Sequence, residues 1–141
     1  MFATKPNRRH VTAALIVLLA SCSRVAARDL CGKKFETIDE LRAQIAPEFA
    51  VSGEDPNWTA FRDRKEPRLW IISKETSPEQ FAVCVSADQA NDGSWAMKAH
   101  ITCKGTTAAC DKIGAFWTKW ANDAGAAMKA GMAEKRAAPS P

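Results

Sequence analysis

The chain has 141 residues, of which 46% are hydrophobic and 26% charged, a composition typical of one globular domain and too short for two. No run of eighteen or more apolar residues occurs in the body of the chain, which excludes a multi-span membrane protein. Seven glycines and seven prolines are too few for collagen or for a disordered linker protein. The formal net charge of +4 hints at nucleic-acid binding, an interpretation that the N-terminus weakens.

The first 21 residues have the features of an export signal. Lys5, Arg8 and Arg9 form a positive start, and residues 11–20 (VTAALIVLLA) form an apolar stretch. Ten residues are too few for a stable helix across a bilayer of about 30 Å. The sequence therefore predicts a cleaved signal peptide over 1–21.

Two processing motifs follow the apolar stretch. Leu19-Ala20-Ser21-Cys22 resembles the bacterial lipobox, in which cleavage precedes a diacylglycerol-modified cysteine. The resemblance implies fatty-acylation of Cys22 and a lipid-anchored protein of the bacterial cell envelope that faces the periplasm. Ser23 favours the outer membrane, by similarity to enterobacterial lipoproteins. Val25-Ala26-Ala27 fits the ordinary signal peptidase, so cleavage after 27 and a soluble periplasmic protein form the alternative.

Cleavage of the signal removes most of the net charge. Three of the twenty basic residues leave and no acidic residue does, so the mature chain carries seventeen basic and sixteen acidic residues, a net charge of +1. A chain this close to neutral has no general attraction for polyanions, and we expect no nucleic-acid partner.

Four cysteines remain once Cys22 is lipidated or cut away, which predicts two disulfides in an oxidising compartment. The alternation in 95–103 places Cys103 on the buried face of a strand, whereas Cys84 faces away from its buried neighbours in 81–86. Cysteines on opposite faces of neighbouring strands cannot be bridged. We therefore predict Cys103–Cys110 and, by elimination, Cys31–Cys84. No pair has C-x-x-C spacing, and no metal or cofactor is expected.

The coarse element pattern predicts an α+β fold. Thr37-Ile38-Asp39-Glu40 is a capping box that starts a short N-terminal helix over about 37–46. A three- to four-stranded antiparallel sheet and a long C-terminal helix, packed on one sheet face, complete the fold. The expected strands cover 68–74, 80–87 and 94–103, with a brief strand at 49–51; residues 58–67 carry no clear signal.

The last helix is expected to begin after Thr106 or Thr107 and to bury one apolar stripe. Its members, at three- and four-residue steps, are Cys110, Ile113, Trp117, Trp120, Ala121, Ala124 and Met128. The predicted layout is a tether over 22–30, one disulfide-braced domain over 31–132 and a disordered tail over 133–141.

Residues suited to catalysis are few. His100 lies on the predicted polar face of a strand, without a recognisable nucleophile motif nearby. A small envelope enzyme that uses His100 with Glu75 or Asp88 is one alternative, but we expect a non-catalytic protein.

Five tryptophans are the unusual feature of the composition. Trp95, Trp117 and Trp120 fall on predicted buried faces, whereas Trp70 points to the sheet face that the C-terminal helix does not cover. An aromatic side chain on an open face is suited to a protein partner or a sugar ring, although the first helix is an alternative cover for it. A run of charges beside these aromatics adds guanidinium groups that suit an anionic partner. The candidate binding residues are Trp58, Phe61, Arg62, Arg64, Arg68 and Trp70.

These features favour a small binding module of the envelope with an envelope protein or glycan as its partner. It is similar to periplasmic inhibitor and immunity proteins in its size, its predicted location and its predicted disulfides. No sequence motif supports this likeness. The alternatives are a structural or assembly subunit of an envelope or secretion complex, and the small enzyme based on His100.

Overall fold

The computed structural model describes residues 27–137; the predicted signal peptide, the lipobox-like motif with Cys22 and residues 138–141 lie outside that range. The elements in chain order are β1 (Arg28–Leu30), β2 (Lys33–Phe35), α1 (Ile38–Ile45), β3 (Ala50–Glu54), β4 (Trp58–Arg62), β5 (Arg68–Ser73), β6 (Gln80–Gln89), β7 (Trp95–Lys104) and α2 (Thr107–Ala137).

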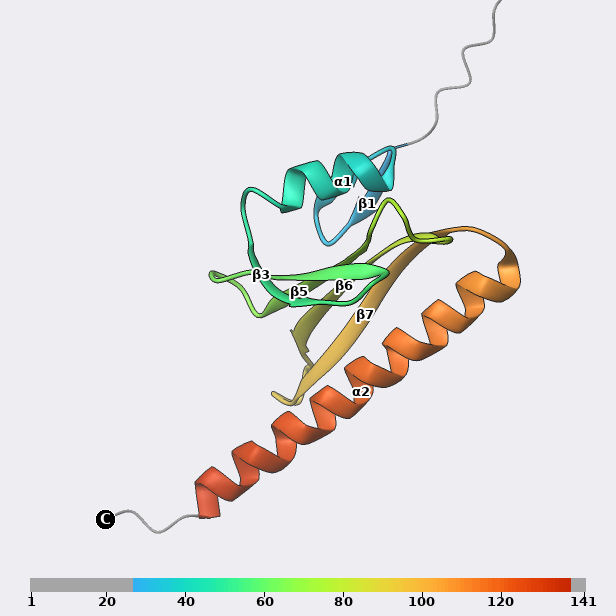
Figure 1. The fold of residues 1–141 in the computed structure, drawn as a ribbon. Coiled ribbons are helices and arrows are strands. Elements are labelled where there is room, and N and C mark those ends of the chain that lie inside the picture. Colours follow the sequence, from blue (N-terminus) through green and yellow to red (C-terminus); the bar gives the residue numbers. More distant parts are fainter. Residues whose placement is uncertain (1–26, 138–141) are drawn as a thin grey trace, which may run out of the picture.

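The fold has three layers around an antiparallel sheet. The sheet has the order β3-β4-β5-β6-β7, so every strand pairs with its neighbour in the chain. The β1–β2 hairpin and α1 pack on one face, and α2 packs on the other, alongside β7 (Figure 1). Each face has its own apolar cluster, one under α1 and one under α2.

The α+β class and the long C-terminal helix are confirmed, but two details of the prediction are wrong. The main sheet has five strands rather than three or four, because 50–54 and 58–62 both join it. A short helix forms at Ile38–Ile45, yet it is not the N-terminal element, since the β1–β2 hairpin precedes it. The hairpin was missed because three-residue strands are too short to show a period.

The cap signal at Thr37 and the turn signal at Gly93 both form, although the Glu40 carboxylate bonds to the Glu36 amide and not to the Thr37 amide of an ideal capping box. The Thr37 hydroxyl accepts a hydrogen bond from the Glu40 amide at 3.1 Å, and the Glu40 carboxylate accepts one from the Glu36 amide at 2.8 Å. Gly93 has φ +80° in the β6–β7 hairpin, a conformation that favours glycine. These local bonds fix the start of α1 and the register of β6 against β7.

Both predicted disulfides are present, Cys31–Cys84 and Cys103–Cys110. Cys84 belongs to the cluster under α1, and Cys103 packs against the cluster under α2, so the predicted assignment to opposite faces is correct. The first bridge joins the N-terminal hairpin to the centre of the sheet. The second joins the end of β7 to the first turn of α2.

The expected domain boundaries need two corrections. Residues 28–30, assigned to the tether, form β1, because Leu30 is buried in the core and the Arg28 guanidinium donates to the Thr102 hydroxyl at 3.2 Å. Residues 133–137, assigned to the disordered tail, continue α2. A helix of 31 residues is about 46 Å long, whereas ten-residue β7 spans about 34 Å, so the end of α2 extends beyond the sheet (Figure 1).

The two glycines of the second half of α2 differ in their surroundings, which gives a matched prediction. A Cβ at Gly125 would lie 3.3 Å from the Met97 backbone nitrogen, whereas a Cβ at Gly131 would meet nothing within 4 Å. Gly131→Ala should therefore raise the free energy of unfolding, by up to about 1 kcal/mol, through helix propensity alone. Gly125→Ala should lower it, because α2 must move away from β7.

Urea unfolding of both glycine variants, followed by far-UV circular dichroism, checks this pair. An equal gain in both would contradict the close approach of α2 to β7 at Gly125.

Candidate functional site

The placement of α2 leaves part of its sheet face without a covering helix. α2 lies mainly against β7, the edge strand, rather than over the middle of the sheet. The Trp117 indole bridges the gap, because it belongs to the same buried cluster as Ala60 of β4 and Ile71 of β5. Over β4 and β5, side chains that project from α2, and not the backbone of the helix, therefore cover this face of the sheet.

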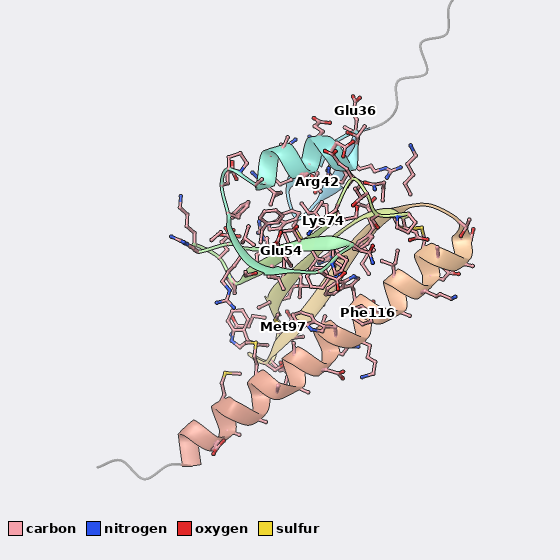
Figure 2. All side chains as sticks on the ribbon, viewed as in Figure 1. Glu36, Arg42, Glu54, Lys74, Met97 and Phe116 are labelled. Atoms are coloured by element: carbon pink, nitrogen blue, oxygen red, sulfur yellow. A yellow bond between two sulfur atoms is a disulfide. The ribbon has the colours of Figure 1, made fainter. Side chains whose placement is uncertain are left out.

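An aromatic cluster forms where α2 faces these strands. The Trp117 ring centroid lies 5.4 Å from that of Trp58, 5.0 Å from Phe116 and 5.9 Å from Trp120, all in edge-to-face geometry. Phe116 and Trp120 stay 59% and 38% exposed, whereas Trp117 beneath them is buried. Figure 2 locates Phe116 on α2. The cluster thus buries one indole and presents two further aromatic side chains to solvent.

Two hollows flank this cluster and share Trp58, Phe116 and Trp117 in their walls, so they lie next to each other along α2. The first, of about 340 Å³, is floored by Ala60, Leu69 and Ile71 and is bordered by Trp120 and Arg62. The second, of about 390 Å³, extends toward the start of α2, where Asp55, Asn57, Glu79 and Lys112 line it. We call these two hollows the aromatic groove.

The charges of the groove lie at its ends. Arg62 is exposed at one end, and in residues 27–137 no carboxylate lies within ion-pair distance of it. Lys112 is exposed at the other end, near Asp55 and Glu79. The middle of the groove is apolar, a layout typical of a binding surface with a hydrophobic centre and a polar rim.

Two of the predicted binding residues are not at the surface. Trp70 and Phe61 are buried on the other sheet face, in the cluster under α1. The prediction that Trp70 faces away from α2 is correct, but α1 covers that face, which was the alternative. The prediction that Trp70 and Phe61 contact an external partner is therefore wrong.

The remaining predicted residues divide between the groove and a loop. Trp58 and Arg62, both on β4, line the groove. Arg64 is exposed in the β4–β5 loop and does not line it. Arg68 is half-buried; its guanidinium donates to the Cys31 carbonyl at 3.3 Å and pairs with Glu66, so it supports the N-terminal hairpin instead of a binding surface.

Sequence reasoning missed most of the groove. Phe116 lies outside the apolar stripe of the last helix, and Trp120 was expected to be buried. Leu69 of β5 is half-buried in the groove floor. Phe116 was a detectable signal, because a large apolar residue on the polar side of an amphipathic helix needs either a partner or solvent exposure.

The His100 pairing required by the enzyme alternative is not formed. His100 is exposed on β7, opposite Cys84 in the register. Glu75 pairs with Arg42 at 3.5 Å and Asp88 with Lys98 at 3.5 Å. Asp88 lies four positions along the strand pair from His100, a distance of about 13 Å.

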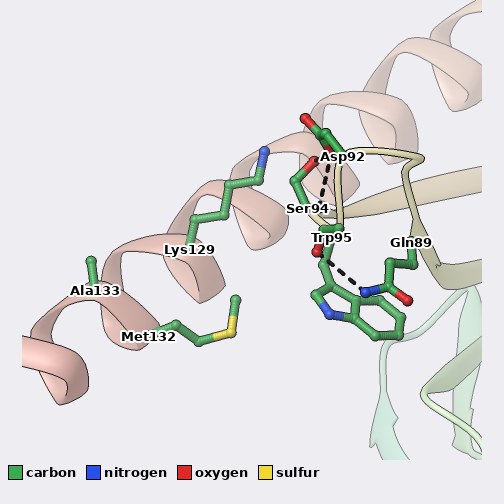
Figure 3. Close-up of a pocket in the computed structure, with 8 residues that line it drawn as sticks. Gln89, Asp92, Ser94, Trp95, Lys129, Met132 and Ala133 are labelled. Carbon is green, nitrogen blue, oxygen red and sulfur yellow. Dashed lines mark hydrogen bonds between the residues drawn. The ribbon is translucent and has the colours of Figure 1, made fainter.

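Another hollow, of about 680 Å³, lies between the β6–β7 hairpin tip and the end of α2 (Figure 3). Its polar groups bond to one another: the Asp92 carboxylate accepts from the Ser94 hydroxyl at 2.6 Å, and the Gln89 amide donates to the Gly93 carbonyl at 3.3 Å. Hydrogen bonds from the Ser94 hydroxyl and amide lower the pKa of Asp92 below its usual 3.8. The polar side chains of the hairpin tip are thus bonded within the hairpin, whereas Lys129 of α2, which also lines this hollow, forms no ion pair in residues 27–137.

Residues 27–137 contain neither a candidate membrane-spanning helix nor a candidate metal site. Within this part of the chain, no helix is long and apolar enough to span a membrane. In the same range, no three histidine, cysteine or acidic side chains lie together in a way that could hold a metal ion.

Comparisons with known proteins leave the fold and the groove as the basis for function. No protein-family model, curated protein or solved structure matches this chain.

Proposed function

We propose that this chain is a non-catalytic binding module of the bacterial cell envelope, anchored by lipid at Cys22, and that the aromatic groove receives its partner. One observation carries the proposal: the groove combines an apolar floor and two exposed aromatic side chains with an Arg62 that has no carboxylate partner in residues 27–137. Aromatic and arginine side chains are the groups that most often dominate binding energy at protein interfaces.

The proposed place in the cell is supported by the two disulfides, which persist in oxidising compartments. The lipobox resemblance favours a lipid-anchored protein that faces the periplasm, and Ser23 favours the outer membrane; a soluble periplasmic protein is the alternative. The similarity to inhibitor and immunity proteins is limited to chain size and disulfide bonding.

A second candidate, a subunit of an envelope or secretion assembly, is favoured by the end of α2. Met128 and Met132 are 43% and 37% exposed where the helix passes the hairpin tip, next to exposed Trp95. These side chains form a separate apolar surface. The two candidates therefore predict binding through different residues.

Affinity capture of the lipoprotein from its own membranes separates them. Phe116→Ala/Trp120→Ala removes the exposed rings of the groove, and we expect at least a tenfold loss of the co-purified partner, because truncation of a binding hot spot costs about 2 kcal/mol or more. Met128→Ala/Met132→Ala, of similar exposure, is the matched control and should retain the partner. Loss only in the methionine variant would favour the assembly subunit, and retention by both variants would rule out the groove. Unfolding curves confirm that each variant is folded.

A further inference from the structure

The width of the sheet indicates how much of this face one helix can cover. Adjacent strands lie about 4.8 Å apart, so five strands span about 19 Å between the outer two. A helix with its side chains is about 10–12 Å across. One helix therefore covers about half of such a sheet face, and α2 takes the half next to β7.

Over β4 and β5 no helix of residues 27–137 lies above the buried Ala60 and Ile71, and the partly buried Leu69 and the exposed Trp120 border the space beside α2. Packed helices lie 8–10 Å apart. A helix axis at that distance from α2 would lie over β5, which is two strands from β7. Leu69, half-buried on β5, would lie beneath it, with Trp58 on one side and the exposed Trp120 on the other. These are the walls and floor of the aromatic groove.

We propose, as an extension that rests on the proposed function, that the partner inserts an amphipathic α-helix into the aromatic groove, parallel or antiparallel to α2. Residues 58–62 of β4 span about 14 to 17 Å along the groove, which corresponds to about three helical turns. The inserted face carries apolar side chains at three- and four-residue steps against Leu69 and Trp120. An acidic residue of the partner pairs with Arg62.

The half of the groove around Leu69 is poorly suited to a sugar. Around Leu69 the floor is aliphatic, and the polar side chains near it are Ser52 and Arg62. A pyranose presents hydroxyl groups around its ring, which need hydrogen-bonding partners when they are buried. An apolar helix face has no such need.

Site-specific photocrosslinking in cells tests this inference on the full lipoprotein. Photoreactive p-benzoylphenylalanine replaces Leu69 in the groove floor or, as a control, the exposed His100 on the opposite face. We expect a crosslink only from position 69, to one partner segment with apolar residues at helical spacing. A synthetic peptide of that segment should gain helical circular dichroism on binding. Arg62→Glu should weaken the peptide at least tenfold, and reversal of its acidic residue should restore binding.

Other outcomes overturn the helix while leaving the proposed function intact. These are a crosslink to a second copy of this chain, to a glycan or lipid, or to a segment that stays non-helical when bound, and the absence of any crosslink from position 69. The proposed function itself fails on a different result, the retention of all partners by Phe116→Ala/Trp120→Ala.

Discussion

Trp70→Ala is expected to lower the free energy of unfolding by about 3–5 kcal/mol, the range for truncation of a large buried aromatic residue. The Trp70 side chain is completely buried between the sheet and α1, and its ring stacks on Phe49 with centroids 6.4 Å apart. It lies opposite Cys84 in the β5–β6 register, so the truncation opens a cavity next to the Cys31–Cys84 bridge. Urea unfolding followed by circular dichroism measures the loss.

Trp70→Phe separates ring packing from the indole N–H. The Trp70 Nε1 is buried and has no hydrogen-bond partner in the described part of the chain. Burial of an unpaired polar group costs about 1–3 kcal/mol, which phenylalanine avoids. We therefore expect Trp70→Phe to lose less than half as much stability as Trp70→Ala. Equal losses would contradict an unpaired indole, and a loss below 1 kcal/mol in Trp70→Ala would contradict its place in the core.

Removal of the Cys31–Cys84 bridge is the second large effect. The bridge joins residues 53 positions apart, and by chain entropy a loop of that length contributes about 4 kcal/mol. Cys103–Cys110 joins residues seven apart and should contribute about 2.5 kcal/mol. Cys31→Ala/Cys84→Ala should thus unfold at clearly lower urea than Cys103→Ala/Cys110→Ala.

Amide hydrogen exchange in the same two variants tests which part of the fold each bridge stabilises. Without the long bridge, the N-terminal hairpin loses its covalent attachment to the sheet, and the backbone amides of 28–35 should exchange with solvent faster while those of β7 change little. If the short-loop variant proves to be the less stable one, the long bridge does not hold the hairpin to the sheet.

Much of the fold could be predicted because its strongest elements carry local signals. The alternation of 95–103 and the turn at Gly93 predict β7 and its hairpin, and the opposite faces of Cys84 and Cys103 then predict the bridges. β4 was not predicted from the sequence. Its neighbours Ala60 and Phe61 are both buried, one on each face of the sheet. A strand that is covered on both faces shows no alternation of apolar and polar residues.

The site was harder to predict because coverage is a tertiary property. Period-two reasoning placed Trp70 on the correct face, but only the packing of α1 and the hairpin determines that this face is closed. Likewise, helical spacing placed Trp120 beside the core, yet α2 lies at the sheet edge and leaves its indole partly exposed. Arg62 was identified because a charge next to aromatics is visible in the sequence.

Export from the cytoplasm is the condition on which the bridges, the anchor and an envelope partner all depend. The intact mass of the protein purified without reductant from its own cells tests it most directly. We predict a chain that begins at Cys22, carries the added mass of its acyl groups and is four hydrogens lighter than the fully reduced form. A product that retains Met1 with all its cysteines as free thiols would contradict the location, the bracing and the proposed role.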